Sequence, residues 1–325
     1  MVRTALLLCF GLAASAAGRP WLAVVEKIGG NVGFYNPAGE RVAAVKAGPV
    51  PHEIVLSPDM RFAYVSDNGI LWMTDPGEGG NTITIIDLKS RSKAGVISLG
   101  QYKRPHGMDI DPKTNRMVVT VENPDGLVLV DLAQRKVLRK YEIQGEDPHM
   151  VVLGPRSEYA YVSCAATNTI SAVQLASGKV KVIPTDKRPQ GGVLSRDGKL
   201  LYFTNSDGNS ISLIDTARNE RVATIQTGRS PNRIALTPDG KTLVYSLSEN
   251  GNAVGFADVA SRKETKVIPL GGRPLSLTMS GDGLWAFSGV QDQDKVFVIS
   301  VPERKIVQVM QTPKGAGPDP ALPLP

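Results

Sequence analysis

Short runs of alternating apolar and polar residues recur along almost the whole chain, separated by turn residues. Residues 189–227 show the pattern, because GGVLS, LLYFTN, SISLID and RVATIQT are β-rich runs with Arg-Asp-Gly, Ser-Asp-Gly-Asn and Thr-Ala-Arg-Asn-Glu between them. Alternation with a period of two and Asp-Gly turns is typical of antiparallel hairpins. Apolar residues at the 3.6-residue spacing of a long amphipathic helix are not found in these units. The pattern therefore predicts units of four antiparallel strands.

This unit repeats along the chain. Each copy opens with a proline followed by a β-rich run and a turn, and the copies begin at Pro51, Pro105, Pro148, Pro189, Pro231 and Pro274. The period is about 42 residues with one longer interval, which is the signature of a repeat architecture. Repeated four-stranded units are typical of the blades of a β-propeller.

Several of these segments match a known repeat. YVSDN, YVSCAATNTI and YFTNSDGNSISLID resemble the YVTN repeat of the YncE-like family of exported seven-bladed propellers. The resemblance extends over nearly all of the chain after the first 17 residues. It implies the fold and export, but it implies no single activity, because members of such families differ in function.

The number of blades follows from the two ends of the chain. Trp21–Lys46 contains three strand-like runs, WLAVVEK, NVGFYN and RVAAVK, but no first strand. The tail AGPDPALPLP (residues 316–325) parallels AGPVPHEIVL (residues 47–56), which leads into the first strand of a unit. We therefore expect one all-β domain over residues 18–325, a seven-bladed β-propeller of four-stranded antiparallel blades. Its ring is closed by the C-terminal tail, which leaves no free sheet edge at the seam.

The N-terminus has the pattern of a signal peptide. Arg3 precedes the apolar stretch ALLLCFGLAA, and small residues follow it, so residues 1–17 are expected to be removed on export to the periplasm or the outside. The stretch is too short to span a bilayer, and no later run is suitable. Cys164 is then the only cysteine of the mature chain, so no internal disulfide is expected.

Composition narrows the range of partners. The formal net charge is +6, but Lys and Arg are interspersed with acids, which indicates a solvated basic surface rather than a nucleic-acid groove. We expect a monomer that binds a small anionic molecule or a protein partner. No Walker loop, dinucleotide fingerprint, HExxH or GxSxG motif is present.

The three histidines share one local setting. His52, His106 and His149 each follow the proline that opens a unit. The innermost strand of a blade begins at the rim of the central channel, so these side chains are expected in neighbouring blades at one channel mouth. Gln190, Asn232 and Leu275 take this ring position in the next three units, and Ala321 takes it in the tail.

Other polar residues map to the same mouth. They precede or follow the ring position, end the second strand of a blade, or lie in the one large insertion, GILWMTDPGEGG (residues 69–80), whose Trp72 and Met73 are expected to fold over the channel. Together with the ring residues, the expected ligand-binding set is His52, Glu53, Asp67, Trp72, Arg104, His106, Glu122, His149, Arg188, Gln190, Asn205, Asn232, Arg233 and Arg273.

Three kinds of chemistry remain open for this mouth. His52, His106 and His149 are candidate ligands of a divalent metal ion, although they lack the short spacing of a familiar metal motif. The arginines suit a carboxylate or phosphate. His106, His149 and Glu122 are candidate catalytic residues of a lactonase-like hydrolase or a lyase. The sequence favours a ligand-binding propeller, with the enzyme as the alternative.

Overall fold

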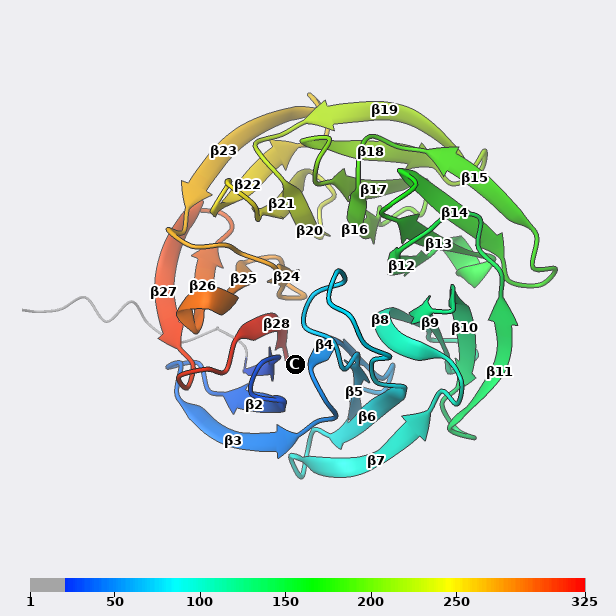
Figure 1. Cartoon of the computed structure of the whole chain (residues 1–325). Helices are drawn as coiled ribbons and strands as arrows, with labels where there is room; N and C mark the ends of the chain where they lie inside the picture. The colour runs from blue at the N-terminus through cyan, green and yellow to red at the C-terminus, as the bar shows by residue number, and fades with distance from the viewer. Residues whose placement is uncertain (1–20, 325) are drawn as a thin grey trace, which may run out of the picture.

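Seven four-stranded antiparallel sheets form the fold in this computed structural model, which describes residues 21–324. The sheets are arranged around a central axis, with one strand of each at the inside and one at the rim (Figure 1). The prediction of a seven-bladed β-propeller is therefore confirmed. Two short 3-10 turns, Pro155–Ser157 and Gln291–Gln293, are the only helical elements in the described range.

The blades are numbered here in chain order, and each strand is given from the inside of the blade to the outside. Blade 1 comprises β28 (Pro318–Pro323), β1 (Leu22–Glu26), β2 (Asn31–Tyr35) and β3 (Arg41–Lys46). Blade 2 comprises β4 (Pro51–Leu56), β5 (Phe62–Asp67), β6 (Thr82–Asp87) and β7 (Ser92–Ser98). Blade 3 comprises β8 (Lys103–Asp111), β9 (Arg116–Asn123), β10 (Asp125–Asp131) and β11 (Lys136–Tyr141). Blade 4 comprises β12 (Pro148–Leu153), β13 (Tyr159–Cys164), β14 (Thr169–Gln174) and β15 (Val180–Pro184).

The remaining blades follow the same order. Blade 5 comprises β16 (Pro189–Leu194), β17 (Leu200–Asn205), β18 (Ser210–Asp215) and β19 (Glu220–Gln226). Blade 6 comprises β20 (Pro231–Leu236), β21 (Thr242–Leu247), β22 (Ala253–Asp258) and β23 (Lys263–Pro269). Blade 7 comprises β24 (Thr278–Met279), β25 (Trp285–Val290), β26 (Lys295–Ser300) and β27 (Lys305–Gln311).

The two ends of the chain close the ring together. Strand β28 pairs antiparallel with β1, with Val24 opposite Ala321 and Glu26 opposite Pro318. The tail therefore supplies the innermost strand of blade 1, as the sequence predicted. With β28 in place, blade 1 has four strands like the other six blades, so β1 has no unpaired edge.

The hydrophobic core lies between adjacent blades rather than at one centre. One cluster joins Ile83 and Ile85 of blade 2 to Val119 and Val128 of blade 3, all nearly or fully buried. Similar clusters join other neighbouring blades. Alternation along the middle strands explains this arrangement, because both faces of each blade meet a neighbouring blade.

A bulge interrupts the inner strand of each blade just after its opening proline. In blade 2, for example, Pro51 is opposite Asp67 but Ile54 is opposite Val65, so one extra residue lies on the inner strand. Hydroxyls of the second strand accept the N–H groups that the bulge leaves unpaired, at Ser66, Thr120, Ser163 and Ser246. A bulge changes the direction of side chains. In blade 2 it lies at His52 and Glu53, so that both of these consecutive residues point toward the channel.

Asp109 of β8 is expected to make the free energy of unfolding depend on pH. Its carboxylate accepts the backbone N–H of Leu153 in the next blade at 2.8 Å, and burial raises the pKa of Asp109 to about 6. An acid whose pKa is raised in the folded state destabilises the fold once it ionises, so the free energy of unfolding is expected to fall between about pH 4 and pH 6. For a shift of this size, the free energy of unfolding is expected to fall by at most about 3 kcal/mol.

The measurement is urea unfolding at pH 4.5 and pH 7. Asp109→Asn is expected to remove this part of the pH dependence, whereas Asp292→Asn, at an exposed position, keeps it. An unchanged pH dependence in Asp109→Asn would contradict the assignment.

The expected signal peptide, residues 1–17, lies outside the described residues. Within residues 21–324, no helix has the length and apolar character needed to cross a membrane.

Candidate functional site

Strand register defines a ring of seven equivalent positions at one end of the channel. The proline that opens each inner strand is opposite the same place on the second strand, as in Pro148–Cys164 and Pro189–Asn205. In blade 1 this proline is Pro318, opposite Glu26. The residues that follow these prolines are His52, His106, His149, Gln190, Asn232, Leu275 and Asp319.

The tail residue predicted for this ring was wrong. Ala321 is fully buried in the core beside Val24, and Asp319 takes the ring position instead. The tail contains Pro318 and Pro320 in succession, and the sequence comparison aligned the second with Pro51. Pairing with β1 selects the first, which shifts the ring position by two residues.

All seven ring residues line one cavity of about 520 Å³. Four consecutive residues of the insertion, Leu71, Trp72, Met73 and Thr74, form another part of its wall. The insertion extends between β5 and β6 and reaches over the centre of the ring (Figure 1). The remaining lining residues are Lys27, Arg188, Ser206, Ser230, Arg233, Ser248, Glu249 and Arg273.

Arg104 fixes the insertion rather than facing the cavity. Its guanidinium donates to the carbonyls of Met73, Asp75 and Gly77 at 3.3, 2.8 and 2.7 Å. It is absent from the lining residues. The sequence predicted Arg104 as a ligand-binding residue at this mouth; in the structure its donors hold the backbone of the insertion.

The insertion, residues 69–80, forms a lid over the cavity, and Trp72 is its aromatic residue in the cavity wall. The guanidinium of Arg273 lies 4.7 Å from the centre of its ring, and the ammonium of Lys27 lies 5.5 Å from it. Both distances suit cation–π interactions. Lys27 also forms a buried ion pair with Asp319 at 3.2 Å, so the lid, the first blade and the tail meet at one point.

The three histidine rings contact one another along three adjacent blades, with His52 edge-on to His106 and His149 tilted against it. The ring centres of His52 and His106 are 4.7 Å apart, and those of His106 and His149 are 4.1 Å apart. Burial is the main cause that holds the pKa of both His52 and His149 well below the ordinary value. Lys27 and His106 lower the pKa of His52 further, and His106 and Arg233 lower that of His149. These two rings are therefore neutral at pH 7.

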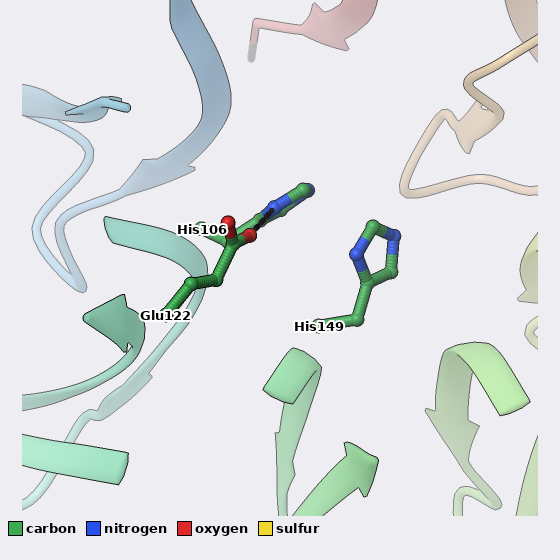
Figure 2. A group of neighbouring side chains, drawn as sticks. All are labelled: His106, Glu122 and His149. Atoms are coloured by element: carbon green, nitrogen blue, oxygen red, sulfur yellow. Dashed lines mark hydrogen bonds and ion pairs between the residues drawn. The ribbon is translucent and has the colours of Figure 1, made fainter. Parts of the chain in front are cut away.

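Hydrogen-bond partners fix the protons on the two outer rings. Nε2 of His52 lies 2.7 Å from the carbonyl oxygen of Ile70, which only accepts, so this nitrogen carries the proton. Nε2 of His149 lies 3.2 Å from Nη1 of Arg233, which only donates, so this nitrogen is the acceptor. A neutral His149 consequently carries its proton on Nδ1, the nitrogen that faces His106 and Glu122 (Figure 2).

The middle ring is oriented by a carboxylate. Oε1 of Glu122 lies 2.7 Å from Nδ1 of His106, and both side chains are nearly buried (Figure 2). A carboxylate only accepts, so the proton lies on Nδ1 and the lone pair on Nε2. His106 lines the cavity, and Nε2 is its ring nitrogen left for a ligand.

A buried ion pair joins blade 2 and blade 6 across the channel. Arg233 of blade 6 donates from Nη2 to Oε1 of Glu53 in blade 2 at 2.5 Å and from Nη1 to Oδ1 of Asn232 at 2.7 Å. The two charged side chains are only about a tenth exposed, at 11% and 10%. Glu53 neutralises the guanidinium, so Arg233 is a structural cation as well as a lining residue.

A metal ion fits this cluster poorly in the arrangement described. Ligand atoms of His106, Glu122 and His149 lie within 4.8 Å of one another, and the bond from Nδ1 of His106 to Glu122 leaves Nε2 of His106 free. Nδ1 of His149 presents a proton where a metal needs a lone pair. His52, the third expected ligand, donates from Nε2 to Ile70, so its remaining lone pair is on Nδ1, a buried atom without a partner. A metal at these residues stays a prediction, and binding would require Arg233 to move.

Several expected ligand residues lie outside the cavity. Asp67 is fully buried and accepts hydrogen bonds from the backbone N–H of Gly48 and from Thr82 and Thr84. Asn205 donates to Ser210 and Ser212. Register gives the reason, because Asp67 and Asn205 are opposite the opening prolines, whereas Glu122 lies one residue later and so faces the other way.

That same later position also contains residues that the sequence reasoning missed. Lys27, Ser206 and Ser248 are the equivalents of Glu122 in blades 1, 5 and 6, and all three line the cavity. Counting one residue past the end of the second strand would have found them.

No family model matches the chain. The YncE protein of Salmonella typhimurium is 25% identical over 205 residues, which is 61% of this chain and 54% of that protein. The chain thus matches about half the length of this curated relative, and the YncE protein of Salmonella typhi gives the same figures. The chain is similar to YncE over this stretch, and its fold is a seven-bladed β-propeller.

Solved structures with the same fold as this chain are also found. A functionally unknown protein from Desulfotomaculum acetoxidans has a TM-score of 0.78 at 16% identity, covering 94% of this chain and 98% of its own. The periplasmic gluconolactonase PpgL of Pseudomonas aeruginosa has a TM-score of 0.75 at 15% identity, covering 94% and 99%. At such low identity these likenesses establish the propeller fold of this chain and nothing finer.

Proposed function

We propose that this YncE-like propeller binds a small organic anion in the cavity at its channel mouth. Arg188 and Arg273 carry the proposal. Both line the cavity, and neither forms an ion pair with an acid in the described part of the chain. Guanidinium groups bind carboxylates with paired, charge-assisted hydrogen bonds.

The surroundings support a small molecule over a protein partner. The volume of about 520 Å³ lies in the usual range for small-molecule sites, and Trp72 covers it from the insertion. Lys27 and Arg233, the other two lining cations, are paired with Asp319 and Glu53. The positive charge left for a ligand is therefore that of Arg188 and Arg273, opposed by Glu249 alone among the lining acids.

Export is part of the proposal. The N-terminal pattern of residues 1–17 motivates it, and the gluconolactonase that shares the fold is described as periplasmic. A propeller at this location would meet small anions from outside the cell.

Anion binding is tested by calorimetry and thermal unfolding with succinate, citrate and gluconate. At least one is expected to raise the melting temperature with increasing concentration. Replacing both Arg188 and Arg273 with Met is expected to weaken its binding by at least about tenfold, because each lost charge-assisted bond is worth about 1.5 kcal/mol or more. Arg218→Met, at an exposed position away from the cavity, is the matched control. The proposal fails if none of the three anions binds or if the double variant binds as the wild type does.

A further inference from the structure

We propose that His106, oriented by Glu122, is a general base that hydrolyses a small ester or lactone carrying a carboxylate. This inference rests on the proposed anion binding and assigns a reaction to the same cavity. It starts from the difference between His106 and its two neighbours.

His106 is the histidine whose unprotonated nitrogen is accessible from the cavity. His52 uses Nε2 as a donor to Ile70, and its Nδ1 is sealed from the cavity without a partner. His149 uses Nε2 as an acceptor from Arg233, and its Nδ1 is likewise sealed. Nε2 of His106 is neither bonded to a described residue nor among the sealed atoms.

Glu122 gives this nitrogen its role. By accepting the Nδ1 proton at 2.7 Å, it keeps the lone pair on Nε2 and stabilises the imidazolium that forms when Nε2 takes up a proton. Glu122 does not line the cavity, so it is a positioning residue and His106 is the catalytic one. A base held by a second group is the usual arrangement for proton transfer.

The step balances without a further reactant. Nε2 of His106 accepts a proton from water, and the water oxygen forms a bond to the ester carbonyl carbon. The carbonyl electron pair moves to its oxygen, and the cations of the cavity stabilise this oxyanion. Collapse then breaks the bond to the alkoxide, which takes the proton back from His106. The net reaction converts an ester and water into an acid and an alcohol.

Hydrolysis fits the cavity better than proton abstraction from carbon. The site is open to water at the channel mouth, and its arginines provide charge for both a free carboxylate and an oxyanion.

The test uses the purified protein with mono-4-nitrophenyl succinate, whose free carboxylate suits the arginines. 4-Nitrophenyl acetate is the neutral probe, and succinate reports binding alone. We expect hydrolysis of the anionic ester, a smaller rate for the neutral one, and a loss of at least about 100-fold in kcat for His106→Gln with succinate binding retained.

The pH profile distinguishes positioning from structure. The groups that face His106 are Glu122, His52 and His149, with Arg233 behind His149. Because a carboxylate stabilises the imidazolium, Glu122→Gln is expected to lower the apparent pKa of the rate profile as well as kcat. Glu220→Gln, the same change at an exposed ion pair with Lys181, is expected to leave both unchanged.

Each outcome has one meaning. Succinate binding without hydrolysis, or equal hydrolysis by His106→Gln, overturns the catalytic inference and leaves anion binding intact. Activity that is lost with a chelator and restored by zinc also overturns it, since a metal would then supply the nucleophile. If succinate, citrate, gluconate and both esters all fail to bind, the proposed function fails and this inference falls with it.

Discussion

A chain that ends at Gly317, without the strand β28, is expected to lose cooperative folding. The strand supplies the inner edge of blade 1, and its loss exposes β1 and the core around Val24. It also removes Asp319, the partner of Lys27 in a buried ion pair. A typical domain has only about 5–15 kcal/mol of stability in total. The measurement is thermal unfolding followed by circular dichroism, together with the soluble yield.

The control for the truncation lies in the same tail. Lys314→Ala changes an exposed residue just before the strand and is expected to unfold at the wild-type temperature. A truncated chain with wild-type melting behaviour would show that β28 does not close the ring.

The buried pair across the channel gives the second large effect. Arg233→Met is expected to cost about 3–5 kcal/mol of unfolding free energy, because it leaves the carboxylate of Glu53 buried without a cation. The double variant Glu53→Gln with Arg233→Met is expected to recover a substantial part of this loss, since no uncompensated charge remains. Urea unfolding of the wild type, both single variants and the double variant forms a complete cycle.

An exposed ion pair provides the matched comparison. Lys181 and Glu220 are 46% and 60% exposed, so Lys181→Met is expected to change stability little. If the double variant at the channel proves no more stable than Arg233→Met, the buried charge of Glu53 is not the source of the loss.

The repeat in the sequence predicted much of this molecule. Opening prolines at a near-constant interval fixed the number of complete units, and the partial first unit with its matching tail predicted how the ring closes. His52, His106 and His149 were placed at one mouth because each follows such a proline. These inferences depend on local pattern, which every blade repeats.

Register limited the prediction where the pattern was ambiguous. Pro318 and Pro320 offer two ways to align the tail, and only pairing with β1 chooses Asp319 over Ala321. Similarly, a shift of one residue at the end of the second strand turns a side chain to the opposite face. That shift directs Glu122 to His106 and removes Asp67 and Asn205 from the cavity.

By itself, then, the sequence determined the blade, its repetition and the end of the channel at which polar residues gather, because strand alternation and turns are local properties. Only the tertiary structure decided which of those residues meet. The contact between Glu53 and Arg233 joins residues 180 positions apart. The proton positions of His52 and His149 depend on Ile70 of the insertion and on Arg233 of blade 6. Such contacts arise from ring closure, which no local pattern specifies.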